Sequence, residues 1–462
     1  MQIEYVTHAS LSLRSRGITI LTDPFYFFDE IAGAFLRHFP PRHINADTFG
    51  RLDYVYSSHI HLDHSHPETL EVLKNKIGTV LLPGKRPSLE RRYRELGLND
   101  IILLENGKPQ ALRNGIEVTS YWSDAVDSAL VVRMDGITVL HQNDCVLDTD
   151  TLKEVAKRYA IDYAFVWYTS SQSLSPLLLP RSEAELDRLA QTREDANFLR
   201  QVECIDILKP KVVIPYSMTM TYVNADQIWL NGIGRLTPVT FKERLGALRP
   251  EQRCTVVQPG DIIDTESDAV QRYRDTNLWG SDLRSYLDNI AEYVRNDPSV
   301  DPKFVCGDLE AVDAQVHAHF RKRFETPFAQ HLEGQFVALT LRGDAGERSY
   351  WIDTQGKKLI TDPYEASHRG NPILKVTMPV IAFLWLISKK WDPFHILFCR
   401  RIEFDFGYPL SMAPNDETLL YIYSLVSIVD YNLQLEPSEV TRLLAASRIQ
   451  NVASRAMAAS GG

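Results

Sequence analysis

The chain of 462 residues has few cysteines, and those that it has are scattered. The five are an odd number and lie far apart, at Cys145, Cys204, Cys254, Cys306 and Cys399. This spacing predicts a reducing compartment and no disulfide framework. It also excludes a Rieske iron–sulfur cluster, whose paired cysteine and histidine ligands lie close together in sequence.

Long apolar runs and an excess of positive charge are also lacking. The longest uncharged apolar run covers residues 376–388, which is too short for a membrane span and predicts a buried helix beginning near Pro379. A net charge of −10 argues against nucleic acid and anionic membranes as partners. Residues 1–5 predict a strand rather than a basic and then apolar leader, so we expect a cytoplasmic protein.

The composition, 44% hydrophobic and 24% charged, is typical of a globular protein, and the length allows two or three domains. Short β-rich runs dominate residues 1–145, and buried strands at 163–167 and 212–214 alternate with helices at 151–159 and 182–207. This order predicts an α/β fold in which helices cover the outer faces of sheets. A composition shift at 264–268 predicts two domains, a catalytic one over 1–264 and an α+β one over 265–462.

Three imidazoles and a carboxylate fall within six residues, as His59, His61, Asp63 and His64. A strand predicted over 52–56 and a helix predicted from Pro67 place them on a strand-to-helix loop. There His59 and His61 can point to one side while Asp63 and His64 face the other. Such an arrangement suits two metal ions with mixed nitrogen and oxygen ligands.

This H-x-H-x-D-H pattern resembles the metallo-β-lactamase superfamily, which implies an αββα sandwich for residues 1–264. The strongest likeness is to the metallo-β-lactamase-like part of the CMP-N-acetylneuraminate hydroxylases. Besides the motif running into residues 67–70, this likeness is carried by residues 127–128, 144–145, 208–210, 215–217 and 390–392. Residues 7–11 and 18–24 resemble the lactonase-like branch of the superfamily, which contains the ascorbate-phosphate lactonases and N-acyl-phosphatidylethanolamine phospholipase D. The resemblance covers most of residues 1–240. The reaction of those hydroxylases does not carry over, because this chain lacks the ligands of their Rieske domain.

The resemblance also implies the roles of the motif residues. His59 and His61 would ligate a first metal ion, and Asp63 and His64 a second. Asp144, at the end of a strand predicted over 137–144, would bridge both ions and take part in catalysis.

The chain departs from the family pattern at two positions where a metal-binding histidine is expected. Hydrolytic members supply a histidine just upstream of the bridging aspartate's strand, whereas residues 118–128 hold only Asp124 and Asp127, either of which would replace it. They supply another after a strand like 212–215, where this chain has Tyr216 and Ser217. A carboxylate-rich site resembles the metallo-β-lactamase-fold diiron hydroxylases of natural-product pathways. It favours two iron ions, with zinc or manganese as alternatives.

Three other residues belong to the prediction. His8 lies near the metal centre in the lactonase-like branch of the superfamily, so we expect it to contact the metal ligands or the substrate, with core packing as the alternative. His66 is expected as the flank of the helix that begins at Pro67 or as a hydrogen-bond donor to a ligand, with direct metal ligation as the alternative. His141 either faces the site or packs in the core, and Asp23 is expected to fix its loop by hydrogen bonding.

Two chemistries are open to such a site. An oxidative enzyme would hydroxylate a C–H bond with dioxygen and an external electron donor. A hydrolase would attack an ester, lactone, amide or phosphodiester with a bridging hydroxide. We favour the monooxygenase. A binding protein with a vestigial site is disfavoured, because the whole motif and Asp144 are present.

The C-terminal part predicts strands over 336–341, 350–353 and 374–377, followed by helices. This order resembles the sterol-carrier-protein-like domains, which shelter apolar ligands. It implies a small hydrophobic biosynthetic intermediate as substrate, carried on coenzyme A or a carrier protein. The alternative role of this domain is to form homo-oligomers.

Overall fold

The computed structural model describes residues 1–27, 30–31, 34–123, 127–169, 177–297, 305–326, 335–391, 393–406 and 414–429. These residues form two compact units. The first is formed by the described residues within Met1–Asp29, Leu36–Ser173 and Gln191–Asp301. The second is formed by those within Glu30–Phe35, Leu174–Ala190 and Pro302–Gly462.

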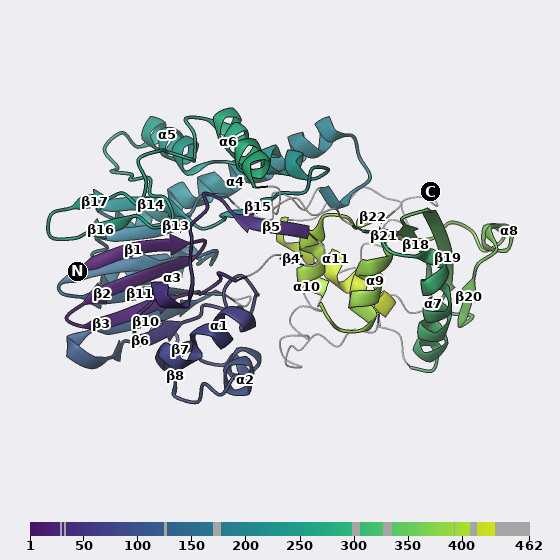
Figure 1. Ribbon diagram of the computed structural model, residues 1–462, viewed down its shortest axis with the longest axis horizontal. Coiled ribbons are helices and arrows are strands. Elements are labelled where there is room, and N and C mark those ends of the chain that lie inside the picture. The colour runs from purple at the N-terminus through teal and green to yellow at the C-terminus, as the bar shows by residue number, and fades with distance from the viewer. Residues whose placement is uncertain are drawn as a thin grey trace. The chain divides into compact units, whose positions relative to one another are not determined.

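The first unit contains two large sheets (Figure 1). In the order of their pairing, the eight strands of one sheet are β17 (Ala269–Gln271), β16 (Ile262–Asp264), β1 (Gln2–Thr7), β2 (Ser10–Ser15), β3 (Ile18–Thr22), β6 (Leu52–Tyr56), β7 (Ile77–Pro83) and β8 (Ile101–Leu104). The six strands of the other are β14 (Val212–Tyr216), β13 (Tyr163–Trp167), β12 (Ile137–His141), β11 (Ser128–Met134), β10 (Glu117–Trp122) and β9 (Gln110–Ala111).

Alternation along the strands builds one core between the sheets and one outside each of them. In β11, Leu130 and Val132 pack with Tyr56 of the other sheet, whereas Ala129 and Val131 pack on the opposite face. Because side chains of a strand alternate between faces, both faces of the sheet are buried. The architecture is therefore the αββα sandwich predicted from the sequence.

Helices α1 to α5 cover the two outer faces, and α6 packs beside them against Phe39 and Trp279. Their bounds are α1 (Pro67–Leu73), α2 (Pro87–Glu95), α3 (Thr149–Arg158), α4 (Glu183–Leu208), α5 (Pro238–Leu248) and α6 (Leu283–Asn296). Leu70 of α1 and Leu89 of α2 pack against Val80 and Leu82 of β7. Residues of α3, α5 and the later part of α4 pack against the six-stranded sheet, among them Leu152, Phe198 and Phe241.

The first unit extends beyond the boundary that the sequence predicts at Asp264. The polar residues 264–268 form a hairpin turn between β16 and β17, because Asp264 Oδ1 accepts hydrogen bonds from the amides of Glu266 and Ser267 at 3.0 Å each. Farther on, Trp279, Tyr286 and Ile290 form a buried cluster with Phe39. The contacts therefore keep the described residues up to 297 with the first unit.

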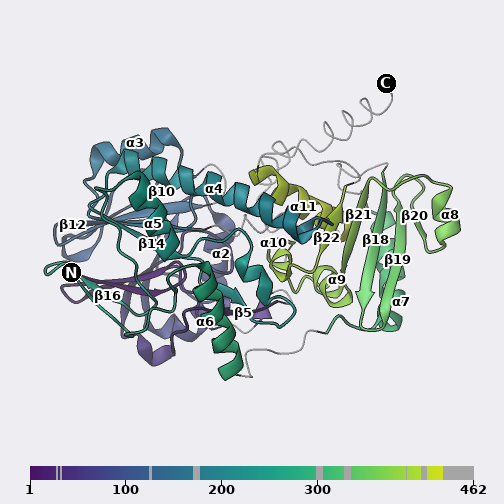
Figure 2. The same cartoon turned by 90° about the horizontal axis from the view of Figure 1, so that it is seen from above.

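The second unit is an α+β structure around a five-stranded sheet (Figure 2). Its order is β20 (Lys358–Ile360), β19 (Gly346–Asp353), β18 (Phe336–Gly343), β21 (Leu374–Pro379) and β22 (Glu403–Asp405), with only β18 and β21 parallel. Its helices are α7 (Leu309–Phe324), α8 (Pro363–Ser367), α9 (Val380–Ile387), α10 (Pro393–Ile396) and α11 (Pro414–Val429). The apolar run 376–388 provides the end of β21 and then α9, with Pro379 as its N-cap.

Two short strands complete the list, β4 (Glu30–Ile31) and β15 (Met220–Tyr222), which pair with different ends of β5 (Ala34–His38). No helix in the described part of the chain combines the length and the apolar character that crossing a bilayer requires.

The packing of Trp279 leads to a test of where the first unit ends. Trp279 is fully buried and its indole N–H donates to the carbonyl of Val257 at 2.9 Å. We expect Trp279→Ala to lower the free energy of unfolding by about 3–5 kcal/mol, measured by urea denaturation, and to speed amide exchange in β1. The control is Trp229→Ala, whose side chain is 43% exposed and whose loss should change stability by about 0.5 kcal/mol or less. If the two substitutions lowered the free energy of unfolding equally, residues 265–297 would not belong to the core of the first unit.

Candidate metal centre

The histidine-rich loop runs from the end of β6 to α1 and is held by hydrogen bonds on both sides. Ser57 Oγ donates to the carbonyl of His64 at 2.9 Å. From α2, Arg92 Nη1 donates to the carbonyls of Ile60 and Ser65 at 2.5 and 3.1 Å. The loop that carries the motif is thus fixed by hydrogen bonds within the protein.

One cluster of donor atoms contains His59, His61 and Asp144, whose potential ligand atoms all lie within 4.8 Å of one another. His59 Nε2 lies 2.8 Å from His61 Nδ1. It also lies 3.4 Å from Oδ1 of Asp127, the residue directly before β11 of the six-stranded sheet. Asp127 therefore lies at this cluster, whereas Asp124 falls outside the described residues.

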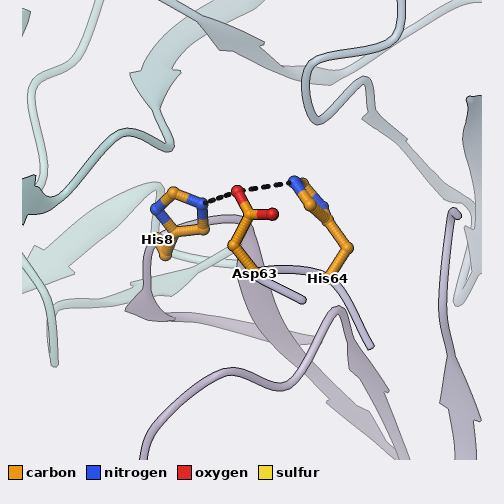
Figure 3. Close-up of side chains that lie close together, drawn as sticks. All are labelled: His8, Asp63 and His64. Carbon is orange, nitrogen blue, oxygen red and sulfur yellow. Dashed lines mark hydrogen bonds and ion pairs between the residues drawn. The ribbon is translucent and has the colours of Figure 1, made fainter. Parts of the chain in front are cut away.

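A second cluster contains His8, Asp63 and His64, again with donor atoms within 4.8 Å (Figure 3). Both imidazoles point at the same carboxylate oxygen, Asp63 Oδ2, from His8 Nε2 at 3.1 Å and from His64 Nε2 at 3.4 Å. His64 Nε2 also lies 3.3 Å from Asp144 Oδ1, so Asp144 is next to both clusters.

The spacing of these atoms fits metal ions. Two ligand atoms that each lie about 2.1 Å from one ion are about 3.0 Å apart at a right angle and about 3.4 Å apart at a tetrahedral angle. The pairs here lie 2.8–3.4 Å apart. Asp127 Oδ1 and Asp144 Oδ1 are buried and accept no hydrogen bond from the described residues, as expected of oxygens that bind a cation.

The pKa shifts of the carboxylates and imidazoles also fit a bound cation. Burial and the negative charge of Asp144 raise the pKa of Asp127 well above its ordinary value. Burial opposes the ionisation of Asp144 too, but the charges of His64 and His59 outweigh it and hold its pKa low. Burial likewise lowers the pKa of His59, helped by the neighbouring His64 and His61. A cation between these groups would relieve the repulsion of the carboxylates and use the neutral form of the imidazoles.

Asp23, directly after β3, lies behind both clusters. It is fully buried, and it accepts hydrogen bonds from the amide and the hydroxyl of Ser58 at 2.7 and 3.0 Å. Its Oδ2 also lies 3.3 Å from His64 Nδ1 and 2.8 Å from His141 Nε2. Burial raises the pKa of Asp23, but the bonds with His141 and His64 outweigh it, so the net shift is downward and the carboxylate stays charged.

These contacts set the tautomers of two candidate ligands. His64 Nδ1 faces the Asp23 carboxylate, and His59 Nδ1 faces Ser58 Oγ at 3.0 Å, whose proton goes to Asp23. Nδ1 therefore carries the proton in both rings. The Nε2 atom of each ring therefore faces the clusters, as a metal ligand requires. Burial opposes the charged form of His64, but Asp144 and Asp63 outweigh it and raise its pKa, so a bound cation would replace the Nε2 proton of that ring.

Tyr216 shows what stands in place of the histidine that the family pattern puts after β14. Its hydroxyl lies 2.7 Å from His141 Nδ1 and accepts a hydrogen bond from the amide of Asn143 at 2.7 Å. Tyr216 thus holds His141 against Asp23 and also fixes the backbone next to Asp144. His141 faces the site rather than packing only as core.

Other sequence expectations also find their places. His66 is the N-cap of α1, where its side chain accepts a hydrogen bond from the amide of Thr69. One histidine was not anticipated, His38 of β5. Its nitrogens lie 2.7 Å from Thr219 Oγ1 and 2.8 Å from the carbonyl of Phe25. Its ring lies 6.1 Å from that of His8, and burial lowers its pKa to about 3. No local motif marks His38, because the pairing of β5 with β15 brings it there.

Comparison with known proteins supports the resemblance. Residues 2–164 match the family model of the beta-lactamase superfamily domain. A 4-amino-L-phenylalanyl-[CmlP-peptidyl-carrier-protein] 3-hydroxylase of Streptomyces venezuelae is 32% identical over 235 residues, which are 47% of this chain and 43% of the relative. A cytidine monophosphate-N-acetylneuraminic acid hydroxylase of Asterias rubens is 35% identical over 142 residues, 30% of this chain and 20% of the relative.

Among solved structures, CmlA, a diiron β-hydroxylase from Streptomyces venezuelae, resembles the chain with a TM-score of 0.39 at 18% identity, over 59% of this chain and 54% of CmlA. Metal-dependent hydrolases are also among the structural neighbours. Likenesses at this level do not bear on the reaction. The chain spans less than half the length of these two curated relatives. The resemblance to the superfamily and the fold class predicted for the N-terminal part are confirmed.

The position of Asp23 leads to a test of how the clusters are held. We expect Asp23→Asn to weaken metal affinity by about 10–100-fold without changing the number of metal ions bound, because the ligand histidines lose the charge that orients them. Titration against a competing chelator measures the change. The control is Asp53→Asn, which changes another buried aspartate, on β6. Asp53 accepts hydrogen bonds from the amide of Thr19 and the guanidinium of Arg113, and its substitution should leave metal affinity unchanged. Equal losses in both variants would point to general destabilisation.

Proposed function

We propose that this chain is a dinuclear metalloenzyme, a non-haem diiron monooxygenase that hydroxylates a small, hydrophobic biosynthetic intermediate. The observation that carries the proposal is the donor set. Its two adjoining clusters combine four imidazoles with Asp63, Asp127 and Asp144. Iron accepts such mixed shells of imidazole and carboxylate, whereas the thiolates that zinc also favours do not belong to this set.

The proposed ligands follow from the contacts. His59, His61 and Asp127 would hold the first ion, Asp63 and His64 the second, with Asp144 shared between them. Asp127 is preferred to Asp124 because its Oδ1 lies 3.4 Å from His59 Nε2 and is buried without a hydrogen-bond partner among the described residues.

The proposed reaction consumes one dioxygen, two electrons and two protons for each C–H bond. One oxygen atom enters that bond as a hydroxyl group, and the other leaves as water. An external electron-carrier protein supplies the two electrons. A pair of bound ferrous ions would supply the redox chemistry and the positions at which dioxygen reacts. The chain itself fixes the ligand loop through Arg92 and Ser57, and holds protons on His59 Nδ1 and His64 Nδ1 through Asp23 and Ser58.

The substrate class is proposed from the relatives. Both are named as hydroxylases, and one of them as acting on an aminoacyl group carried by a peptidyl carrier protein. A substrate tethered to a carrier protein or to coenzyme A would suit the predicted apolar-ligand domain at the C-terminus. That domain would then bind the substrate, and forming homo-oligomers remains its alternative role.

The first test concerns the metal and its ligands. Protein produced with added iron should contain two iron ions per chain by elemental analysis. We expect Asp127→Ala to lose one ion, because it removes a direct ligand, and Asp124→Ala to keep both. The reverse result would assign the ligand to Asp124. Two zinc ions with full activity and no iron would remove the oxidative proposal.

The second test concerns the reaction class. With labelled dioxygen and a reductant, the product should carry one labelled oxygen atom, measured by mass spectrometry. His61→Ala and Asp144→Ala should abolish this incorporation, since each removes a proposed ligand. Turnover without oxygen and reductant, with the label arriving only from water, would instead establish the hydrolase that uses a bridging hydroxide.

A further inference from the structure

His8 occupies a backbone position that its own residue type disfavours. β1 and β2 pair through Thr7 and Ser10, so His8 and Ala9 form the two-residue turn of this hairpin. His8 has a φ of +48°. In two-residue hairpin turns, a positive φ at the first position usually goes with glycine, which adopts it without steric cost. A backbone outlier next to the candidate metal centre raises the hypothesis that the side chain has a function.

The side chain of His8 is buried among ligand-type groups. The residue is 1% exposed, and its Nε2 lies 3.1 Å from Asp63 Oδ2. His64 Nε2 reaches the same oxygen from the other side (Figure 3). The other nitrogen of His8, Nδ1, is buried and has no hydrogen-bond partner among the described residues. The three donor atoms lie as close together as those of the cluster of His59, His61 and Asp144.

The second cluster also lacks a ligand in the family pattern. The histidine expected after β14 is replaced by Tyr216, whose hydroxyl is engaged by His141 and Asn143. Without another residue, the second ion would have only Asp63, His64 and the shared Asp144. The first ion would have His59, His61, Asp127 and Asp144.

We propose that His8 is a direct ligand of the second metal ion, through Nε2, and takes the place of the missing histidine. This inference rests on the dinuclear site of the proposed function and deepens it. Each ion then receives two imidazoles and one carboxylate of its own, with Asp144 shared. The competing role is a hydrogen bond from His8 to Asp63 that only orients this carboxylate.

The backbone of His8 offers a clean test. His8→Gly removes the imidazole at a position where glycine is favoured, so the hairpin is expected to stay folded. Metal-free protein is titrated with Mn²⁺, which accepts the same donors as ferrous iron. We expect wild type to bind two ions and His8→Gly to bind the second more than about 100-fold more weakly, beyond the loss typical of a residue that only orients a ligand.

Free imidazole provides the direct readout. Added ¹⁵N-imidazole should enter the space left by the ring, restore the second Mn²⁺ ion and show ¹⁵N hyperfine coupling to manganese in pulsed electron paramagnetic resonance. The matched control is His38→Ala, which removes a neighbouring buried histidine whose two nitrogens bond to Thr219 and Phe25. It should bind both ions as wild type does and show no coupling to added imidazole.

The outcomes separate this inference from the proposed function. A second ion that binds within about 100-fold of its wild-type affinity in His8→Gly, without ¹⁵N coupling, would make His8 an orienting residue and leave the dinuclear enzyme in place. Wild-type protein that binds no Mn²⁺, iron or zinc would overturn both proposals.

Discussion

The rest of the site depends on the hydrogen bonds that the buried carboxylate of Asp23 makes. A charge without access to water is costly unless hydrogen bonds surround it. Here Ser58 donates to it from the loop of the motif, and His64 and His141 approach it from two sides. Asp23 thereby fixes the Nδ1 proton of His64 directly and that of His59 through Ser58. Two candidate ligands are thus oriented by a residue that belongs to neither cluster.

The site around Asp23 contains several carboxylates that repel one another. Asp63 is buried, and buried oxygens of Asp127 and Asp144 lie near it without hydrogen-bond partners among the described residues. The pKa of His64 is raised because Asp144 and Asp63 outweigh its burial, so this ring compensates part of the charge, whereas burial lowers the pKa of His59. A divalent cation satisfies both tendencies, because it attracts the carboxylates and binds neutral imidazole. The repulsion among these buried carboxylates is therefore an argument that the site binds metal.

Local sequence patterns predicted much of this arrangement. The strand Leu52–Tyr56 and the helix Pro67–Leu73 lie where the apolar run and the proline indicated, and these elements fix the motif loop. The place of His38 near the clusters depends on the pairing of β5 with β15, and that of Asp127 depends on how the two sheets pack together; spacing along the chain encodes neither. The boundary placed at Asp264 came from polar composition, but a hairpin turn and a linker share that composition. The apolar residues Trp279, Tyr286 and Ile290 were the better guide to the end of the first unit.

The contacts of Asp23 also join the two sheets at one edge. Asp23 follows β3 of the eight-stranded sheet, whereas His141 ends β12 and Tyr216 ends β14 of the six-stranded sheet. If one sheet slid past the other by a single residue, about 3.3 Å, His141 would leave the reach of Asp23. Residues in the core between the sheets can therefore be substituted only if the new side chains preserve this alignment. Packing and chemistry in this protein have to evolve together.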